Sequence, residues 1–310
     1  MSTMLRGPLG LTANDLKRRK DKINASEVPA VVGSSPFLNK GDIYEFKNTP
    51  LSPLPPSEAM KWGQWLERPL LYYTQDRLRK FLGIPTLRVT RQGIRRSHPN
   101  GCMACTLDAR LQGRDEAIEA KTHAVLHGRV DWDAWGNEEW TDAIPQHVLD
   151  QVLAQQAVYP EMVRTWVVLW AGRSTPSMYC VERANHLARI AHIERECCDF
   201  WNNHILPGIP PAEIPHMETV KRDMRVRLPD HTVTLSNEPV ELSKRLGAQI
   251  AALEKQKREA DAAIRRDMSG AMHGITALGH RVTISEHNRK GYTVAPTTVS
   301  RMAIELNLAA

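Results

Sequence analysis

The sequence lacks any apolar run that approaches the roughly 20 residues needed to cross a bilayer. Its first ten residues, MSTMLRGPLG, also lack the apolar centre of a secretory signal. From these absences we expect a cytoplasmic protein that does not contact a membrane. Hydrophobic content of 42% and charged content of 25% are ordinary for globular proteins, which excludes disorder of the whole chain.

Cysteine is scarce, and its odd number of five makes a poor disulfide framework. Reduced thiols in a reducing compartment fit better. Cys102 and Cys105 have the Cys-x-x-Cys spacing, with His98 just upstream, which supplies part of a zinc or iron–sulfur ligand set. A second such pair is missing, although Cys197 and Cys198 can in principle help. A structural metal is therefore the minor alternative to ordinary thiols.

The positive charge is modest, because 41 Lys and Arg against 35 Asp and Glu give +6 and a pI near 9.1. Such an excess permits attraction to phosphate backbones without requiring it. The distribution is more informative than the total. Basic residues crowd two short stretches: Lys17, Arg18, Arg19, Lys20 and Lys22 in the first, and Arg88, Arg91, Arg95 and Arg96 in the second. Each is either a solvated face or part of a surface for a polyanion.

Apolar residues at spacings of three and four predict most of the helices. These are expected over 12–23, 26–32, 57–81, 145–156, 184–205 and 239–268. On the last of them Leu242, Leu246, Ile250 and Leu253 form one stripe, typical of a coiled coil, a docking helix or structural cover. Five tryptophans are expected in the core, with a DNA contact as the alternative for the first two: Trp62, Trp65, Trp166, Trp170 and Trp201.

Strand signals dominate residues 85–135. The runs 102–111 and 117–123 are separated by Gln112-Gly113-Arg114-Asp115, which predicts a β-hairpin. The apolar run 163–170 predicts a buried strand. A further small hairpin is expected over 280–301, with its turn at 288–291. The predicted class is α/β, with a mixed sheet and its helices over residues 1–206 and a smaller helical and β-hairpin extension over 207–310.

Three residues carry the chemistry of the predicted hairpin. Asp108 precedes the turn, and Glu119 and Lys121 lie two residues apart on the second strand, so both project from one face. Two carboxylates on a rigid sheet suit a hard divalent cation, with the carbonyl oxygen of Ala120 as a further ligand. Such a cation activates water and neutralises charge on a phosphodiester, while Lys121 orients the nucleophile. The same spacing also occurs on an exposed Glu/Lys strand face.

Five motifs in order are more specific than this spacing. They are Ile23-Asn24-Ala25-Ser26-Glu27-Val28, Gly63-x3-Glu67, Thr106-Leu107-Asp108, Glu119-Ala120-Lys121-Thr122 and Pro145-x5-Gln151-x3-Gln155. Together they resemble the YqaJ viral recombinase family, the phage lambda exonuclease group of PD-(D/E)XK nucleases. The resemblance covers roughly residues 15–205 and implies a restriction-endonuclease-like sheet flanked by helices. Asn24 stands where threonine is common, and Pro29 follows closely, which puts the local helix geometry in doubt.

The resemblance implies roles by position. Asp108, Glu119 and Ala120 would bind Mg2+, with Mn2+ as a plausible substitute, and Glu67 would complete a site for one or two ions. Lys121 and Gln151 would position the nucleophilic water. A second group, Arg19, Ser26 and Thr106 together with Gln151, would bind a terminal 5′-phosphate. The simpler readings are a solvated helix residue for Glu67, a surface glutamine for Gln151 and a helix cap for Ser26.

The resemblance also implies a function. This is an exonuclease that degrades linear double-stranded DNA 5′ to 3′ to mononucleotides and leaves a 3′ single strand. It further implies a homotrimer, a single-strand annealing protein as partner, and a phage or prophage origin in a bacterial host. The alternatives are a structure-selective or endonucleolytic member of the superfamily, a non-catalytic DNA-binding protein of the same fold, and a small-molecule enzyme with an acidic metal site.

Overall fold

The computed structural model describes residues 13–48, 58–91, 93–122, 135–172, 174–217, 219–220, 232 and 234–284. It divides the chain into two compact units, Met1–Arg227 and Leu228–Ala310. Within the described ranges, no helix combines the length and the apolar character that a membrane span requires.

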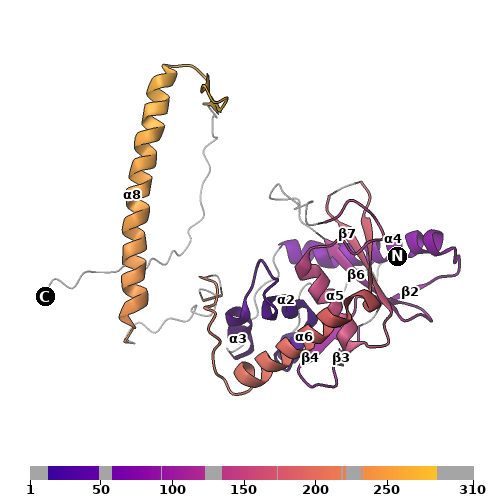
Figure 1. Cartoon of the computed structure of the whole chain (residues 1–310). Helices are drawn as coiled ribbons and strands as arrows, with labels where there is room; N and C mark the ends of the chain where they lie inside the picture. The colour runs from indigo at the N-terminus through magenta and orange to yellow at the C-terminus, as the bar shows by residue number, and fades with distance from the viewer. Residues whose placement is uncertain are drawn as a thin grey trace. The chain divides into compact units, whose positions relative to one another are not determined.

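A five-stranded mixed sheet forms the centre of the first unit (Figure 1). Its order is β2 (Val89–Arg91), β5 (Ala109–Leu111), β6 (Glu116–Thr122), β7 (Arg164–Trp170) and β8 (Ser177–Glu182). Strands β6 and β7 are parallel, and the other neighbours are antiparallel. The predicted α/β class is therefore confirmed, and so are the buried strand at 163–170 and the pairing of β5 with β6 as a hairpin.

Helices cover both faces of this sheet because its buried strands alternate between two apolar clusters. In β7, Trp166 and Val168 pack with the leucines of α4 (Glu58–Leu82), whereas Val167 and Leu169 pack with α5 (Gln146–Val158). On the α5 side, α6 (Leu187–Phe200) and α2 (Val28–Val31) complete the layer. The sheet is thus enclosed by helices, which holds the strand that carries Glu119 in a rigid frame.

A smaller three-stranded sheet lies beside the first, in the order β1 (Ile23–Asn24), β4 (Met103–Thr106) and β3 (Arg95–Ser97). The predicted single run over 102–111 is therefore wrong, since β4 and β5 belong to different sheets. In a continuous strand Leu107 and Ala109 would face the same side, but the chain bends at Asp108. Leu107 is buried in the cluster under α5, whereas Ala109 is buried in the cluster under α4. This bend places Asp108 between the two sheets.

The helix predictions hold in outline. The helix expected over 12–23 is α1 (Ala13–Lys20), and the one over 26–32 is a 3-10 turn at Ala25–Glu27 followed by α2. The helix over 184–205 begins with a 3-10 turn at Arg183–His186 and ends with a π turn at Trp201–Ile205. A further helix, α3 (Lys40–Asn48), precedes α4.

The tryptophan prediction is partly wrong. Trp166 and Trp201 are buried, but Trp62 and Trp65 are 47% and 43% exposed and pack edge to face on α4. They lie near the beginning of α4, ahead of the leucines Leu70, Leu71 and Leu78 with which that helix contacts the sheet.

The end of the first unit is attached to α3. Tyr44 donates a hydrogen bond from its hydroxyl group to the carbonyl oxygen of Gly208 at 2.6 Å. The main-chain N–H of His216 donates to Asp42 at 2.8 Å. The first compact unit accordingly extends to Arg227.

The second unit contains α8 (Asn237–Met268) and a hairpin of β9 (His273–Ile275) and β10 (Arg281–Thr283). The long helix is confirmed, and its leucine stripe is exposed within the described residues. Val282, expected in a hairpin over 280–301, pairs with Gly274 upstream. The expected turn at 288–291 lies outside the described residues.

Candidate active site

The carboxylate of Glu119 is buried and held by three donors. It projects from β6 toward α5, where Gln151 donates from Nε2 to Oε1 and Gln155 donates from Nε2 to Oε2, each at 2.7 Å. The two glutamines are four residues apart, so they lie one above the other on one face of α5. Lys121 Nζ lies 2.7 Å from Oε1 of the same carboxylate. The orientation of Glu119 is thereby fixed before any ligand binds.

Lys121 completes a triangle with two of these residues. Its position two residues after Glu119 places it on the same face of β6, as the spacing predicts. Its Nζ donates to Oε1 of Gln151 at 2.8 Å. The structure therefore brings together three predicted site residues, Glu119, Lys121 and Gln151, in one hydrogen-bonded group.

Asp108 joins this group from the bend between β4 and β5. Its Oδ2 accepts a hydrogen bond from the main-chain N–H of Ala120 at 2.9 Å. The pairing of β5 with β6 ends at Ile118, so this edge of β6 is open to Asp108. The N–H and C=O groups of one strand residue point to the same side, so the Ala120 carbonyl also faces this opening.

The charges at this site fit a divalent cation. Burial, and then the negative charge of Glu119, raise the pKa of Asp108 well above its ordinary value. Asp108, Glu119 and the Ala120 carbonyl offer hard oxygen ligands, the kind that magnesium binds. Within the described ranges, no group of three acidic, histidine or cysteine side chains forms a metal site, so the carbonyl would be needed.

Glu67 lies near the two carboxylates but has a partner of its own. It projects from α4, and its carboxylate oxygen lies 2.8 Å from Nη2 of Arg91. Its charge contributes to the raised pKa of Asp108. A role for Glu67 as a metal ligand would require the ion to compete with Arg91.

Asp108→Asn is expected to stabilise the metal-free protein. The pKa of an aspartate carboxyl in the unfolded protein is about 3.9. When its pKa in the folded protein is higher, the carboxyl destabilises the fold progressively as the pH rises from the unfolded-state pKa toward the folded-state pKa. The variant should therefore unfold a few degrees higher at neutral pH and gain nothing near pH 3. Added Mg2+ should raise the unfolding midpoint of the wild type but not of the variant. Thermal unfolding with and without Mg2+ checks this, and equal Mg2+ stabilisation of both proteins contradicts it.

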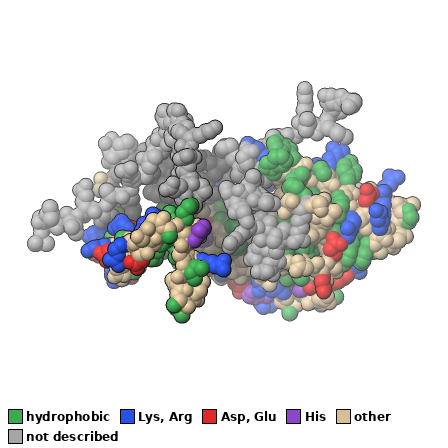
Figure 2. Space-filling view, turned by 90° about the horizontal axis from the view of Figure 1, so that it is seen from above, with side chains coloured by type: hydrophobic (Ala, Val, Ile, Leu, Met, Phe, Trp, Pro, Cys, Tyr) green, Lys and Arg blue, Asp and Glu red, His purple; other side chains and the backbone are tan. Residues whose placement is uncertain are grey.

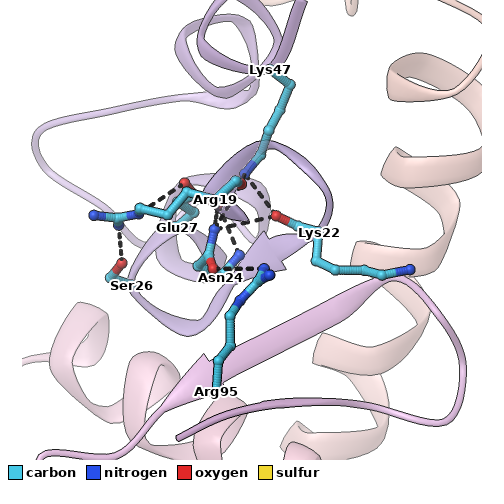
Figure 3. A network of polar contacts seen from close by, with 7 residues as sticks. All are labelled: Arg19, Lys22, Asn24, Ser26, Glu27, Lys47 and Arg95. Atoms are coloured by element: carbon cyan, nitrogen blue, oxygen red, sulfur yellow. Dashed lines mark hydrogen bonds and ion pairs between the residues drawn. The ribbon is translucent and has the colours of Figure 1, made fainter. Parts of the chain in front are cut away.

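A second group of predicted residues meets at the end of α1. Arg19 donates from Nη2 to the hydroxyl oxygen of Ser26 at 2.8 Å (Figure 3). Thr106, at the end of β4, lines the same open cavity of about 550 Å³. Asp108 and Glu119 line this cavity as well. The two predicted groups, one for phosphate and one for metal, therefore open into a single cavity.

Basic and acidic side chains both line the cavity. On the face of the larger unit drawn in Figure 2, basic side chains are interspersed with acidic and apolar ones. Four arginines, Arg18, Arg19, Arg91 and Arg95, line the cavity together with the carboxylates of Glu67, Asp108 and Glu119. Arg91 is paired with Glu67.

Residues 16–165 match the family model of the YqaJ-like viral recombinase domain. Every predicted site residue lies within the matched range, and the predicted resemblance is confirmed. No curated protein matches the chain.

Solved structures similar to the chain include two exonucleases. An alkaline exonuclease from Laribacter hongkongensis is 19% identical with a TM-score of 0.46, and the match covers 68% of this chain and 97% of that protein. A phage-related exonuclease from Haemophilus somnus 129PT is 10% identical with a TM-score of 0.41, and the match covers 59% of this chain and 95% of that protein.

The matched region contains a buried network under Arg19 that the sequence analysis missed (Figure 3). Lys47 from α3 has a fully buried side chain and lies 2.6 Å from Oε2 of Glu27. It also donates to the carbonyl oxygens of Lys22 and Arg19. The carboxylate of Glu27 accepts hydrogen bonds from the main-chain N–H and the side chain of Asn24, at 2.8 and 3.0 Å.

The network connects the end of α1 to the segment that carries Ser26. The spacing of Asn24 and Glu27 is that of a capping pair, a signal that was available in the sequence. Lys47 is 20 residues from Glu27, and no sequence spacing indicates their contact. Gln155 was part of a quoted motif without a role, and the structure gives it one as a donor to Glu119.

Proposed function

We propose that this protein is a metal-dependent exonuclease that digests linear duplex DNA 5′ to 3′ from phosphorylated ends. The observation that carries the proposal is the single cavity lined both by Arg19, Ser26 and Thr106 and by Asp108 and Glu119. Lys121 is paired with the carboxylate of Glu119. A terminal phosphate bound by the first group would place a nearby phosphodiester bond at the second. The match of residues 16–165 to the model of a viral recombinase family agrees with an activity on DNA.

Two carboxylates and one main-chain carbonyl would bind the metal. Asp108, Glu119 and the Ala120 carbonyl would hold one or two Mg2+ or Mn2+ ions. Such an ion supplies a Lewis acid that activates water and offsets phosphate charge.

Lys121 carries an ammonium group whose position is fixed by Glu119 and Gln151. It would hydrogen-bond the attacking water and stabilise the negative charge that develops on the phosphate. Gln151 fixes Lys121 with its oxygen and Glu119 with its nitrogen, so one amide positions both functional groups.

The proposal is tested with linear duplex DNA labelled at either the 5′ or the 3′ end, in Mg2+ or in EDTA. We expect Mg2+-dependent release of mononucleotides, the 5′ label first, and no cleavage of closed circles. Cleavage of closed circles would instead favour an endonuclease. Binding without hydrolysis in Mg2+ would favour a non-catalytic DNA-binding protein, and indifference to DNA would favour a small-molecule enzyme.

The remaining parts of the proposal are supported by the family resemblance. They are a cytoplasmic homotrimer encoded by a phage or prophage, and a single-strand annealing protein that binds the exposed 3′ strand. Analytical ultracentrifugation of the full chain tests the trimer, for which a monomer at micromolar concentration is the contrary result.

Arg19→Ala is expected to lower the preference for 5′-phosphorylated over 5′-hydroxyl ends by about 10- to 100-fold. A hydrogen bond to a charged group contributes about 1.5–3 kcal/mol, which corresponds to this range. Lys17→Ala is the matched control, because Lys17 lies on the same helix, is exposed and does not line the cavity. Initial rates on the two substrates measure the preference. An unchanged ratio in Arg19→Ala rejects the phosphate role.

A further inference from the structure

Arg95 lies opposite Thr106 in the small sheet. In the antiparallel pair of β3 and β4 the two residues are direct partners, so their side chains are on the same face. Both residues line the cavity that contains Arg19 and Ser26. Sequence analysis placed Arg95 in a basic stretch without a role.

The guanidinium of Arg95 is held in position, but only some of its N–H groups have hydrogen-bond partners among the described residues. Its Nη2 donates to the side-chain oxygen of Asn24 at 3.1 Å, and Figure 3 shows it reaching Asn24 from β3. Its Nε is buried and has no hydrogen-bond partner among the described residues. Arginine presents its donors as a rigid fork, so an anion that occupied the open side would bind without reorganising the side chain.

The charges around Arg95 favour an anion of more than one charge. Arg19 and Lys47 both face Glu27, whose carboxylate is paired most closely with Lys47 at 2.6 Å, against 3.9 Å for Arg19. Together with Arg95, three cations surround this one carboxylate and leave an excess of two positive charges. Burial lowers the pKa of Arg95 from its ordinary value, and the guanidinium remains charged at neutral pH. The charges of Arg18 and Asp21 also affect the pKa of Arg95, in opposite directions, so these two charges offset each other.

We infer that Arg95 is the second arginine of the terminal-phosphate site and determines selectivity for a 5′-phosphomonoester. This inference rests on the proposed function. A terminal phosphate carries about −1.5 to −2 charges near pH 7, whereas an internal phosphodiester carries one. Arg19 and Arg95, approaching from α1 and β3, match the dianion with two guanidinium groups. Asn24 positions Arg95, and the Glu27–Lys47 pair positions Arg19.

The test measures binding without hydrolysis. A fluorescent hairpin DNA with a 5′-phosphate or a 5′-hydroxyl end is titrated with the full chain in Ca2+. We expect Arg95→Gln to lower the preference for the phosphate end about 10-fold or more, and Arg95→Lys to lower it less. The matched control is Arg96→Gln, which removes the same charge from the neighbouring residue. Arg96 is on the opposite face of β3, pairs with Glu161 at 2.6 Å and stacks over Tyr159.

A second readout separates phosphate binding from a structural role. The wild-type preference should fall below about pH 6, where the phosphomonoester becomes a monoanion, and this fall should be shallower in Arg95→Gln. If Arg95→Gln does not fold, Arg95→Lys decides by the same measurements.

An unchanged preference in the Arg95 variants overturns the inference, and so does equal weakening for both ends. A wild-type protein that binds the two ends equally also overturns it. Digestion of linear duplex by the wild type is assayed separately. Absence of digestion with intact phosphate selectivity would reject the proposed catalysis and leave the role of Arg95 standing.

Discussion

Glu119→Gln is expected to lower kcat on linear duplex DNA by about 10²–10³-fold or more, the loss that follows removal of one preorganised charge from a catalytic site. The substitution keeps the shape of the side chain but removes the negative charge that Asp108 and Lys121 both face. Lys121→Ala is expected to have a comparable effect, because it removes the ammonium group proposed to stabilise charge on the phosphate. Rates in saturating Mg2+ measure both variants.

The matched control for Glu119→Gln is Glu116→Gln. Glu116 is buried on the same strand but is three residues away, so it faces the opposite side, where it accepts a hydrogen bond from Trp166 Nε1 at 2.7 Å. It should retain most of the wild-type kcat. Digestion by Glu119→Gln at the wild-type rate would mean that the catalytic residues are misassigned, and an equal loss in both variants would mean that the effect is structural.

Lys47→Met is expected to lower the free energy of unfolding by about 3–5 kcal/mol, the usual result of leaving one member of a buried ion pair without its partner. The side chain of Lys47 is 0% exposed and that of Glu27 is 7% exposed, so water cannot replace the lost ammonium group. Urea unfolding measures the change. The remaining folded protein should also lose its preference for phosphorylated ends, because Lys47 connects the Arg19 carbonyl to Glu27, the residue after Ser26.

The double variant Lys47→Met, Glu27→Gln is expected to recover much of this stability, since it removes both buried charges. Lys40→Met is the control on the same helix. Lys40 pairs with Glu196 at 3.5 Å, both side chains are partly exposed, and such pairs contribute about 0–1 kcal/mol. A loss of less than about 1 kcal/mol in Lys47→Met would show that the pair does not stabilise the fold as its burial indicates.

Local sequence patterns predicted the parts of the site that lie within one element. The two-residue spacing of Glu119 and Lys121 placed them on one strand face, and the four-residue spacing of Gln151 and Gln155 placed them on one helix face. The family motifs then paired Arg19 with Ser26, which are in contact at 2.8 Å. In each case a short repeat or a short separation determines the contact.

The remaining parts depend on contacts between distant segments. The bend at Asp108 arises because Leu107 and Ala109 are buried against different helices, which the apolar run 102–111 does not reveal. The position of Arg95 follows from its register opposite Thr106, and that of Lys47 from the packing of α3. The strand signal of Val282 does not indicate its upstream partner, Gly274 in β9.

The proposed catalysis requires Asp108 and Glu119 to share a divalent cation. Soaking a crystal of the full chain in Mn2+ and recording anomalous scattering for the wild type and for Asp108→Asn tests this requirement. We expect a peak within about 2.5 Å of a carboxylate oxygen of each residue and of the Ala120 carbonyl oxygen, and its loss in the variant. A wild-type crystal with no peak between these two carboxylates, or with an equal peak in the variant, would contradict it.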